Sequence, residues 1–164
     1  MLLISYELNK TKIENLESKL SDEFYFNNVM EESLMTVSGR FEISFKGEDI
    51  CQLDYVWVLL LAADFTASCK HIADSNIVFY DISSFDEPLA IRVKNKGNNV
   101  ILTLMDGEGH RVNSVEKDVS VPFNEYQYAI ISANESLMKD ISKYRNYWKH
   151  PITKQLVKNL KVVI

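Results

Sequence analysis

The sequence predicts an α+β fold in which a mostly antiparallel sheet packs against a central buried helix and C-terminal helices. Strand patterns occur in runs, instead of alternating strictly with helices, which favours α+β over α/β. Residues 55–65 are apolar at nearly every position, as in a helix that is buried on most sides. Residues 123–141 repeat apolar side chains at helical spacing, which predicts a second long helix.

The first third of the chain should pair strands before it reaches the buried helix. Apolar and polar side chains alternate over residues 2–8, which predicts a strand, and a short helix is expected over residues 10–20 with Thr11 and Glu14 as a capping box. Residues 24–29 are rich in aromatics but show no pattern. Residues 34–53 are predicted to form an antiparallel meander that turns at residues 46–49. Asp54 is then the expected N-cap of a helix from Tyr55 to about Ala73.

The second half should continue with strands and end with helices. Strands are predicted over residues 76–81, 89–94, 100–105 and 110–121, with a hairpin signal at residues 106–109. Pro122 or Asn124 should start the long helix, which runs to about Tyr144, and Pro151 should open a last short helix. We expect residues 1–164 to form a single domain, with a basic helical segment at about 144–164.

The composition is that of a globular protein, at 164 residues, 46% hydrophobic and 25% charged. A chain of this length can bury a core without disulfides or a structural metal. Cys51 and Cys69 lack CxxC spacing and are expected to be buried thiols in a reducing compartment. The N-terminus lacks the features of a signal peptide, and the apolar run over residues 56–63 is far shorter than the roughly 20 residues that cross a bilayer. We therefore expect a cytoplasmic protein with no membrane association.

Charge is distributed unevenly along the chain, whose net charge is −5. Residues 1–82 carry 14 acidic and 6 basic side chains, whereas the stretch from Lys139 onward carries seven basic and one acidic. The basic tail is either a solvated helix or a surface for an anionic partner, and the acidic body would attract a basic one.

No catalytic, cofactor-binding or metal-binding residue is predicted. The chain has no phosphate-binding glycine loop, no nucleophile elbow and no zinc-type histidine spacing. Two alternatives remain open at this point. An enzyme site could be assembled from distant residues such as His71, Asp106 and His110. The tail interleaves cations with aromatic rings around Trp148, as nucleic-acid surfaces do, although the net acidity of the chain argues against that partner.

Acidic side chains provide the candidate partner-binding surface. Adjacent carboxylates in turns usually point into water, and a set of them on one surface would steer a basic protein. A wider acidic patch would draw on Glu31, Glu32, Glu42, Glu48, Asp49, Asp54, Asp86 and Glu87. The residues predicted to bind the partner are Glu42, Glu48, Asp49, Asp86 and Glu87.

Several segments, in this order, resemble small bacterial proteins of unknown-function families, many of which act as immunity proteins for polymorphic or contact-dependent toxins. They are Gly39-Arg40-Phe41-Glu42-Ile43-Ser44-Phe45, the stretch from Leu53 to Phe65, Phe79-Tyr80, Glu87-Pro88-Leu89 and Phe123-x-x-Tyr126-x-x-x-Ile130. The likeness covers roughly residues 35–142 and leaves out the basic tail. It implies a non-catalytic cytosolic antidote that binds a toxin domain, with no catalytic residues to carry over and an oligomeric state that stays open.

Overall fold

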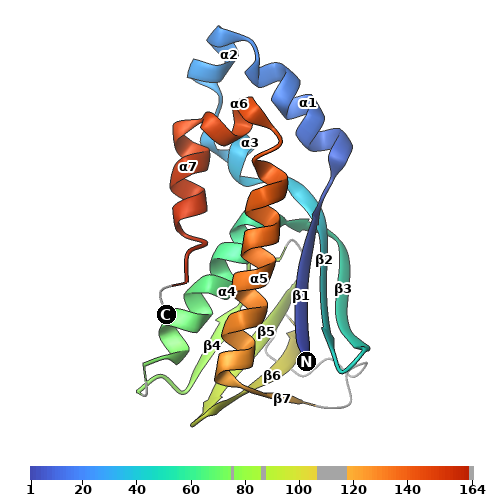
Figure 1. Cartoon of the computed structure of the whole chain (residues 1–164), viewed down its shortest axis with the longest axis vertical. Coiled ribbons are helices and arrows are strands. Elements are labelled where there is room, and N and C mark those ends of the chain that lie inside the picture. Colours follow the sequence, from blue (N-terminus) through green and yellow to red (C-terminus); the bar gives the residue numbers. More distant parts are fainter. Residues whose placement is uncertain (75, 86–87, 107–117, 163–164) are drawn as a thin grey trace.

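The computed structural model describes residues 1–74, 76–85, 88–106 and 118–162, and it confirms the α+β class (Figure 1). No helix in this part of the chain is long and apolar enough to cross a bilayer. In chain order the elements are β1 (Leu2–Leu8), α1 (Lys10–Leu20), α2 (Glu23–Asn28), α3 (Glu31–Met35), β2 (Ser38–Phe45), β3 (Glu48–Trp57), α4 (Val58–Ile72), β4 (Phe79–Ile82), β5 (Leu89–Lys96), β6 (Asn99–Asp106), β7 (Val119–Pro122), α5 (Phe123–Ile141), α6 (Arg145–Lys149) and α7 (Pro151–Lys158).

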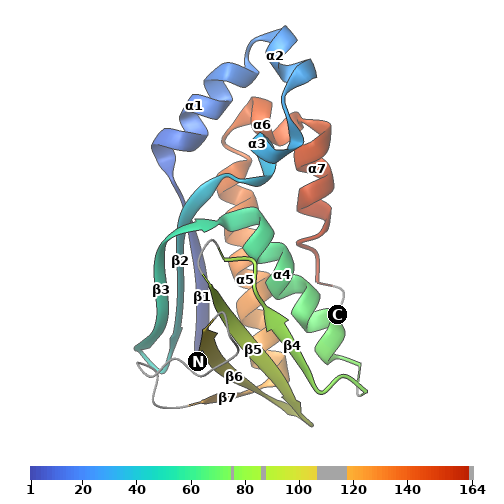
Figure 2. The same ribbon diagram turned by 180° about the vertical axis from the view of Figure 1, so that it is seen from behind.

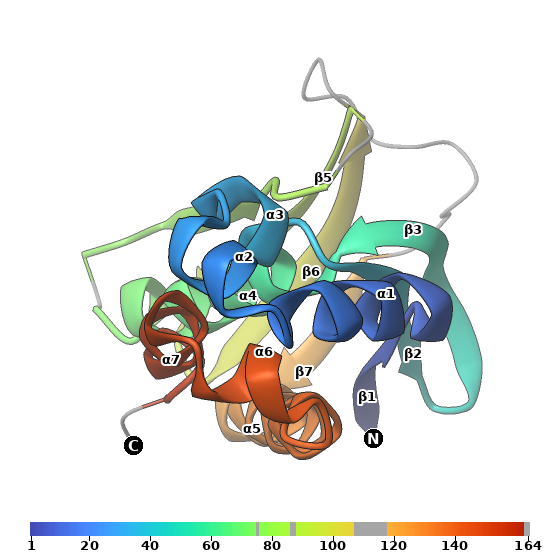
Figure 3. The same cartoon turned by 90° about the horizontal axis from the view of Figure 1, so that it is seen from above.

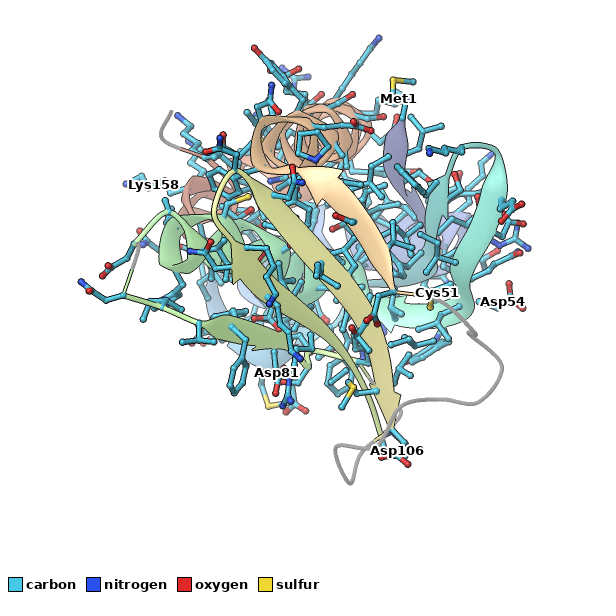
Figure 4. All side chains as sticks on the ribbon, turned by 90° about the horizontal axis from the view of Figure 1, so that it is seen from below. Met1, Cys51, Asp54, Asp81, Asp106 and Lys158 are labelled. Carbon is cyan, nitrogen blue, oxygen red and sulfur yellow. The ribbon has the colours of Figure 1, made fainter. Side chains whose placement is uncertain are left out.

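The strands form two antiparallel sheets instead of the one that the sequence predicted. The first has the order β1-β2-β3 and the second the order β4-β5-β6-β7 (Figure 2). The chain enters α4 directly after β3, so strand pairing stops there and resumes only with β4. Seen from below, α4, α5 and the two sheets surround a common interior (Figure 4).

The hydrophobic core joins both sheets through α4. The Phe41 ring of β2 lies 5.5 Å from the Phe65 ring of α4 and 6.0 Å from that of Phe85, which follows β4. Cys51 and Cys69 are both buried, as the sequence predicted. Burial raises the pKa of the Cys69 thiol to about 12, which makes it a poor nucleophile at neutral pH.

The predicted start of the buried helix at Tyr55 is wrong. Tyr55 to Trp57 continue β3, with Val56 opposite Gly39, and α4 begins at Val58. Asp54 is not the N-cap. Its carboxylate accepts a hydrogen bond from Arg40 Nε at 3.1 Å. Aromatic and β-branched residues suit a strand as well as a buried helix, and pairing with β2 decides between the two.

Two short helices at the N-terminal end were not predicted. Asp22 caps α2 by accepting a hydrogen bond from Tyr25 N at 2.8 Å, and α3 occupies the segment where the first meander strand was expected to start. Thr11 and Glu14 form no capping box, because Asn9 caps α1 through a hydrogen bond from Lys12 N. From above, α1 and α2 lie over the end of the molecule opposite the second sheet (Figure 3).

The C-terminal helices follow the prediction with one addition. α5 ends at Ile141, three residues before the expected end, and α6 forms between it and the predicted α7. β4 starts at Phe79, three residues later than expected, and β7 covers Val119–Pro122, so it ends one residue after the predicted end of the strand expected over residues 110–121. Residues 107–117 lie outside the described part of the chain. The hairpin predicted at 106–109 lies, beyond Asp106, outside the described residues.

Tyr147 ties the basic C-terminal segment to the N-terminal helices. Its ring is fully buried and its hydroxyl donates a hydrogen bond to Leu34 O at 2.6 Å. Glu17 of α1 accepts hydrogen bonds from Asn146 N and Tyr147 N, each at 2.8 Å, and so caps the start of α6. Burial raises the pKa of Tyr147 well above its usual value, so its hydroxyl stays a donor at neutral pH.

Tyr147→Phe should lower the free energy of unfolding by about 1–3 kcal/mol, because it leaves the buried Leu34 carbonyl without its donor. Urea denaturation followed by circular dichroism measures the change. Tyr128→Phe is the matched control, since the Tyr128 side chain is 66% exposed. Equal stability of the two variants would contradict the assigned role of this hydrogen bond.

Candidate functional site: an acidic face on the first sheet

The first sheet has one buried face and one exposed face. Along β1, burial alternates residue by residue, with Ile4 and Tyr6 facing the core and Ser5 and Glu7 facing solvent. Helices α4 and α5 cover the inner face (Figure 4). The outer face is therefore a solvent-exposed surface built on paired strands, which hold its side chains in fixed register.

Strand register brings acidic residues together on this outer face. Glu42 lies opposite Ser5 on one side and Gln52 on the other, while Asp49 lies opposite Ser44. Glu7 lies opposite Arg40. We call the following residues the acidic face: Glu7, Glu42, Asp49 and Asp54. Glu48 is exposed, but it lies opposite Phe45, in the row that continues to the buried Leu2, and so does not belong to this face.

Arg40 is a basic side chain within the acidic face, at the end of the sheet next to α1. Its guanidinium lies 3.1 Å from the Asp54 carboxylate and 3.8 Å from that of Glu42. The Arg40 side chain is 45% exposed and that of Asp54 83% exposed, so these pairs add little to stability. Further basic side chains border the face at both ends, with Lys46 in the β2–β3 turn and Lys10 and Lys12 at the start of α1.

Exposed apolar side chains and a hollow lie next to the carboxylates of the acidic face. Leu3 is 53% exposed and Tyr55 43% exposed, with Lys12 Nζ 4.9 Å from the centre of the Tyr55 ring. A hollow of about 520 Å³ opens between Glu7 and Asp54, at the end of the sheet next to α1. Charged, polar and apolar groups on one exposed sheet suit the docking of a protein surface.

Two of the five predicted partner-binding residues, Glu42 and Asp49, lie on the acidic face. Glu48 is exposed, but it lies opposite Phe45 and so not on this face. Asp86 and Glu87 lie outside the described residues. Glu31 and Glu32 of the wider set belong to α3, beyond α1. Sequence reasoning did not select Glu7, although the alternation over residues 2–8 already placed it on the polar side of β1.

The histidine-based enzyme site is not assembled in the part of the chain that the structure describes. The His71 ring stacks on Tyr80 at 5.1 Å near the end of α4, whereas Asp106 occupies the last position of β6 and His110 lies outside the described residues. Nor do the described residues contain a group of three or more histidine, cysteine or carboxylate side chains that would hold a metal.

His150 is a structural residue and not the linker that the sequence suggested. It is 6% exposed and caps α7, because its Nδ1 accepts a hydrogen bond from Ile152 N at 3.2 Å. With Nδ1 as an acceptor, the ring proton sits on Nε2, which donates to Phe26 O at 3.0 Å.

Asp64 on α4 is a polar hub that the sequence did not reveal. Its carboxylate accepts hydrogen bonds from the Tyr80 hydroxyl at 2.6 Å, from Ser83 N at 2.8 Å, and from the backbone and side chain of Ser84 at 3.1 and 3.0 Å. Burial, together with this hydrogen bond and the Asp64 charge, raises the pKa of Tyr80. The carboxylate accepts hydrogen bonds from four donors, and Asp64 therefore holds the segment after β4 against α4.

The aromatic rings of the basic tail pack inward. Tyr147 is buried, and Tyr144 and Trp148 are half-buried against the core. These rings therefore do not form an exposed platform on which bases would stack. The lysines stay outside, and Lys158 lies on the opposite side of the molecule from Asp54 (Figure 4).

The acidic face and the basic tail thus form two separate charged surfaces, and comparison with known proteins adds no ligand or activity to either. The sequence matches no protein-family model, and searches among curated proteins and solved structures return no match.

Proposed function

We propose that the chain is a non-catalytic protein-binding domain that docks a basic partner on its acidic face. The observation that supports this most directly is the gathering of four carboxylates on the exposed face of one sheet. Complementary charge accelerates diffusional encounter and fixes orientation, and it does so most strongly at low ionic strength.

The opposite placement of the basic tail adds to this electrostatic argument. No acidic residue occurs after Asp140, and Lys154 and Lys158 are exposed on α7. A basic partner would be attracted to the acidic face and repelled by the exposed lysines of α7. This difference in charge favours a single docking orientation.

Within this class we favour a bacterial immunity protein that binds and neutralises a cognate toxin in the cytosol. The support is the resemblance of residues 35–142 to such antidotes, together with the sign of the acidic face. Many toxin domains are basic nucleases, and an acidic sheet face is complementary to them.

Affinity purification of the tagged chain from its source cells, followed by mass spectrometry, identifies the partner. The triple variant Glu7→Gln/Glu42→Gln/Asp49→Asn should then lower its association rate about tenfold or more at low salt. Arg40→Gln should raise that rate, because it removes a positive charge from the same face. Stopped-flow or surface plasmon resonance measurements at several salt concentrations give both values.

Glu14→Gln/Asp74→Asn/Glu135→Gln is the matched control, because it changes the net charge equally at exposed positions outside the acidic face. The docking proposal fails if the two triple variants slow association equally. The immunity role is tested separately by expressing the partner alone. Growth arrest that co-expression relieves supports the role, and a harmless partner contradicts it.

A further inference from the structure

Two large apolar side chains project into solvent at the end of the molecule that carries α2. Phe24 is 78% exposed and Met30 is 69% exposed. Their neighbours Tyr25 and Phe26 are half-buried and pack against the core, so α2 has an inner and an outer side. Exposed aromatic and methionine side chains of this size are enriched among residues that anchor protein–protein contacts.

Four carboxylates flank these two side chains. Asp22 and Glu23 precede Phe24, and Glu31 and Glu32 follow Met30. All four are exposed, and none forms an ion pair within the part of the chain that the structure describes. We call residues 22–32 the acidic corner.

The acidic corner is held in place by α6 and α7. His150 donates a hydrogen bond to Phe26 O at 3.0 Å, and the rings of the two residues lie 4.6 Å apart. Lys149 Nζ lies 5.4 Å from the centre of the Phe26 ring. Asp22 caps the start of α2. A surface that is already ordered loses less conformational entropy on binding than a mobile one does.

We propose that the acidic corner is a second docking surface, on which Phe24 and Met30 contact apolar side chains of a partner protein whose binding surface is rimmed by lysine or arginine. The anchors supply the apolar contact, and the four carboxylates select a basic rim, because an acidic or neutral rim would leave them uncompensated. The corner is separate from the acidic face, since the eleven residues of α1 span about 16 Å between them (Figure 1).

Site-specific photo-crosslinking of the full chain tests this proposal. A photoreactive phenylalanine analogue is placed at position 24, at position 30, or at position 128, where Tyr128 is exposed on α5 outside the corner. We expect positions 24 and 30 to crosslink to one protein in the source cells, through peptides that combine apolar residues with lysine or arginine, while position 128 does not. The proposal is overturned if all three positions give the same products, or if 24 and 30 capture lipid, nucleic acid or a second copy of this chain.

The affinity of the chain for the partner that crosslinking identifies is then measured with purified proteins. Phe24→Ala/Met30→Ala should lower this affinity about 30-fold or more, which is the effect of losing a hot-spot residue. Glu23→Lys/Glu31→Lys should also weaken it, whereas Glu14→Lys/Glu135→Lys should not. Unchanged affinity in the first two variants would overturn the proposal. The triple variant Glu7→Gln/Glu42→Gln/Asp49→Asn leaves the acidic corner intact. Crosslinking from position 24 in this variant therefore tests the acidic corner independently of the acidic face.

Discussion

Gly39→Ala should lower the free energy of unfolding by at least about 3 kcal/mol, because the added methyl group has no room. A Cβ at this position would lie 2.0 Å from Glu7 O and 2.9 Å from Val58 Cγ1. The closer atom belongs to the backbone of β1, which pairs with β2 at this point, so the clash cannot be relieved by rotating a side chain. Either β1 or β2 must shift, and with it the register that positions Glu7 opposite Arg40.

Chemical denaturation measures the free energy of unfolding of purified Gly39→Ala, with Gly97→Ala as the matched control. Gly97 has a φ of 71°, and a Cβ there would meet nothing within 4 Å. Its replacement should therefore cost only the about 1–2 kcal/mol of a left-handed backbone. If both variants lose the same stability, the close approach of β1 to Gly39 is not what makes glycine necessary.

Raising the pH above about 10 should unfold the protein, because folding then opposes the ionisation of buried tyrosines. Burial raises the pKa of Tyr6, Tyr126 and Tyr147 well above 10, the value of an unperturbed tyrosine. Burial also raises that of Cys69 from 9.0 to about 12. Above these unperturbed values the unfolded chain releases protons that the folded chain retains.

The sign and the size of this effect follow from proton linkage. The contribution of these groups to stability is fully present below about pH 9, where both states are protonated, and is lost as the pH rises from there. Each group removes about 1.4 kcal/mol per pH unit, so the four together remove about 5 kcal/mol per unit between pH 10 and 12. A domain of ordinary stability, about 5–15 kcal/mol, would unfold within this range.

Circular dichroism and phenolate absorbance, recorded together from pH 8 to 12, measure the transition. We expect the buried tyrosines to ionise in the same step in which the fold is lost. Tyr6→Phe is the informative variant, because the buried Tyr6 hydroxyl has no hydrogen-bond partner among the described residues, and its removal should move unfolding to higher pH. Folded protein with fully ionised tyrosines at pH 12 would contradict the assigned burial.

The elements that were predicted correctly are those whose pattern is local. β1 and the β2–β3 hairpin show alternation with turn signals, and α1 and α5 show helical spacing. Their burial patterns follow from side-chain period alone. The polar side of β1 and β2, and so the outward position of Glu7 and Glu42, was readable in the same way.

Other features depended on which segments pair in three dimensions. Tyr55 to Trp57 fit either a strand or a buried helix, and pairing with Ser38 and Gly39 made them part of β3. The division into two sheets depends on where α4 interrupts pairing, which no single segment encodes.

The two candidate surfaces show the same division between sequence and tertiary structure. The sequence by itself determined the α+β class, the acidic body, the basic tail and the polar side of β1 and β2, because these depend on composition and side-chain period. Only the tertiary structure placed Glu7 and Asp54 beside Glu42, because antiparallel register joins residues that are far apart in the chain. It also decided that Phe24 points outward while Phe26 packs inward, because the Phe26 ring lies 4.6 Å from that of His150, which is more than a hundred residues away in the chain.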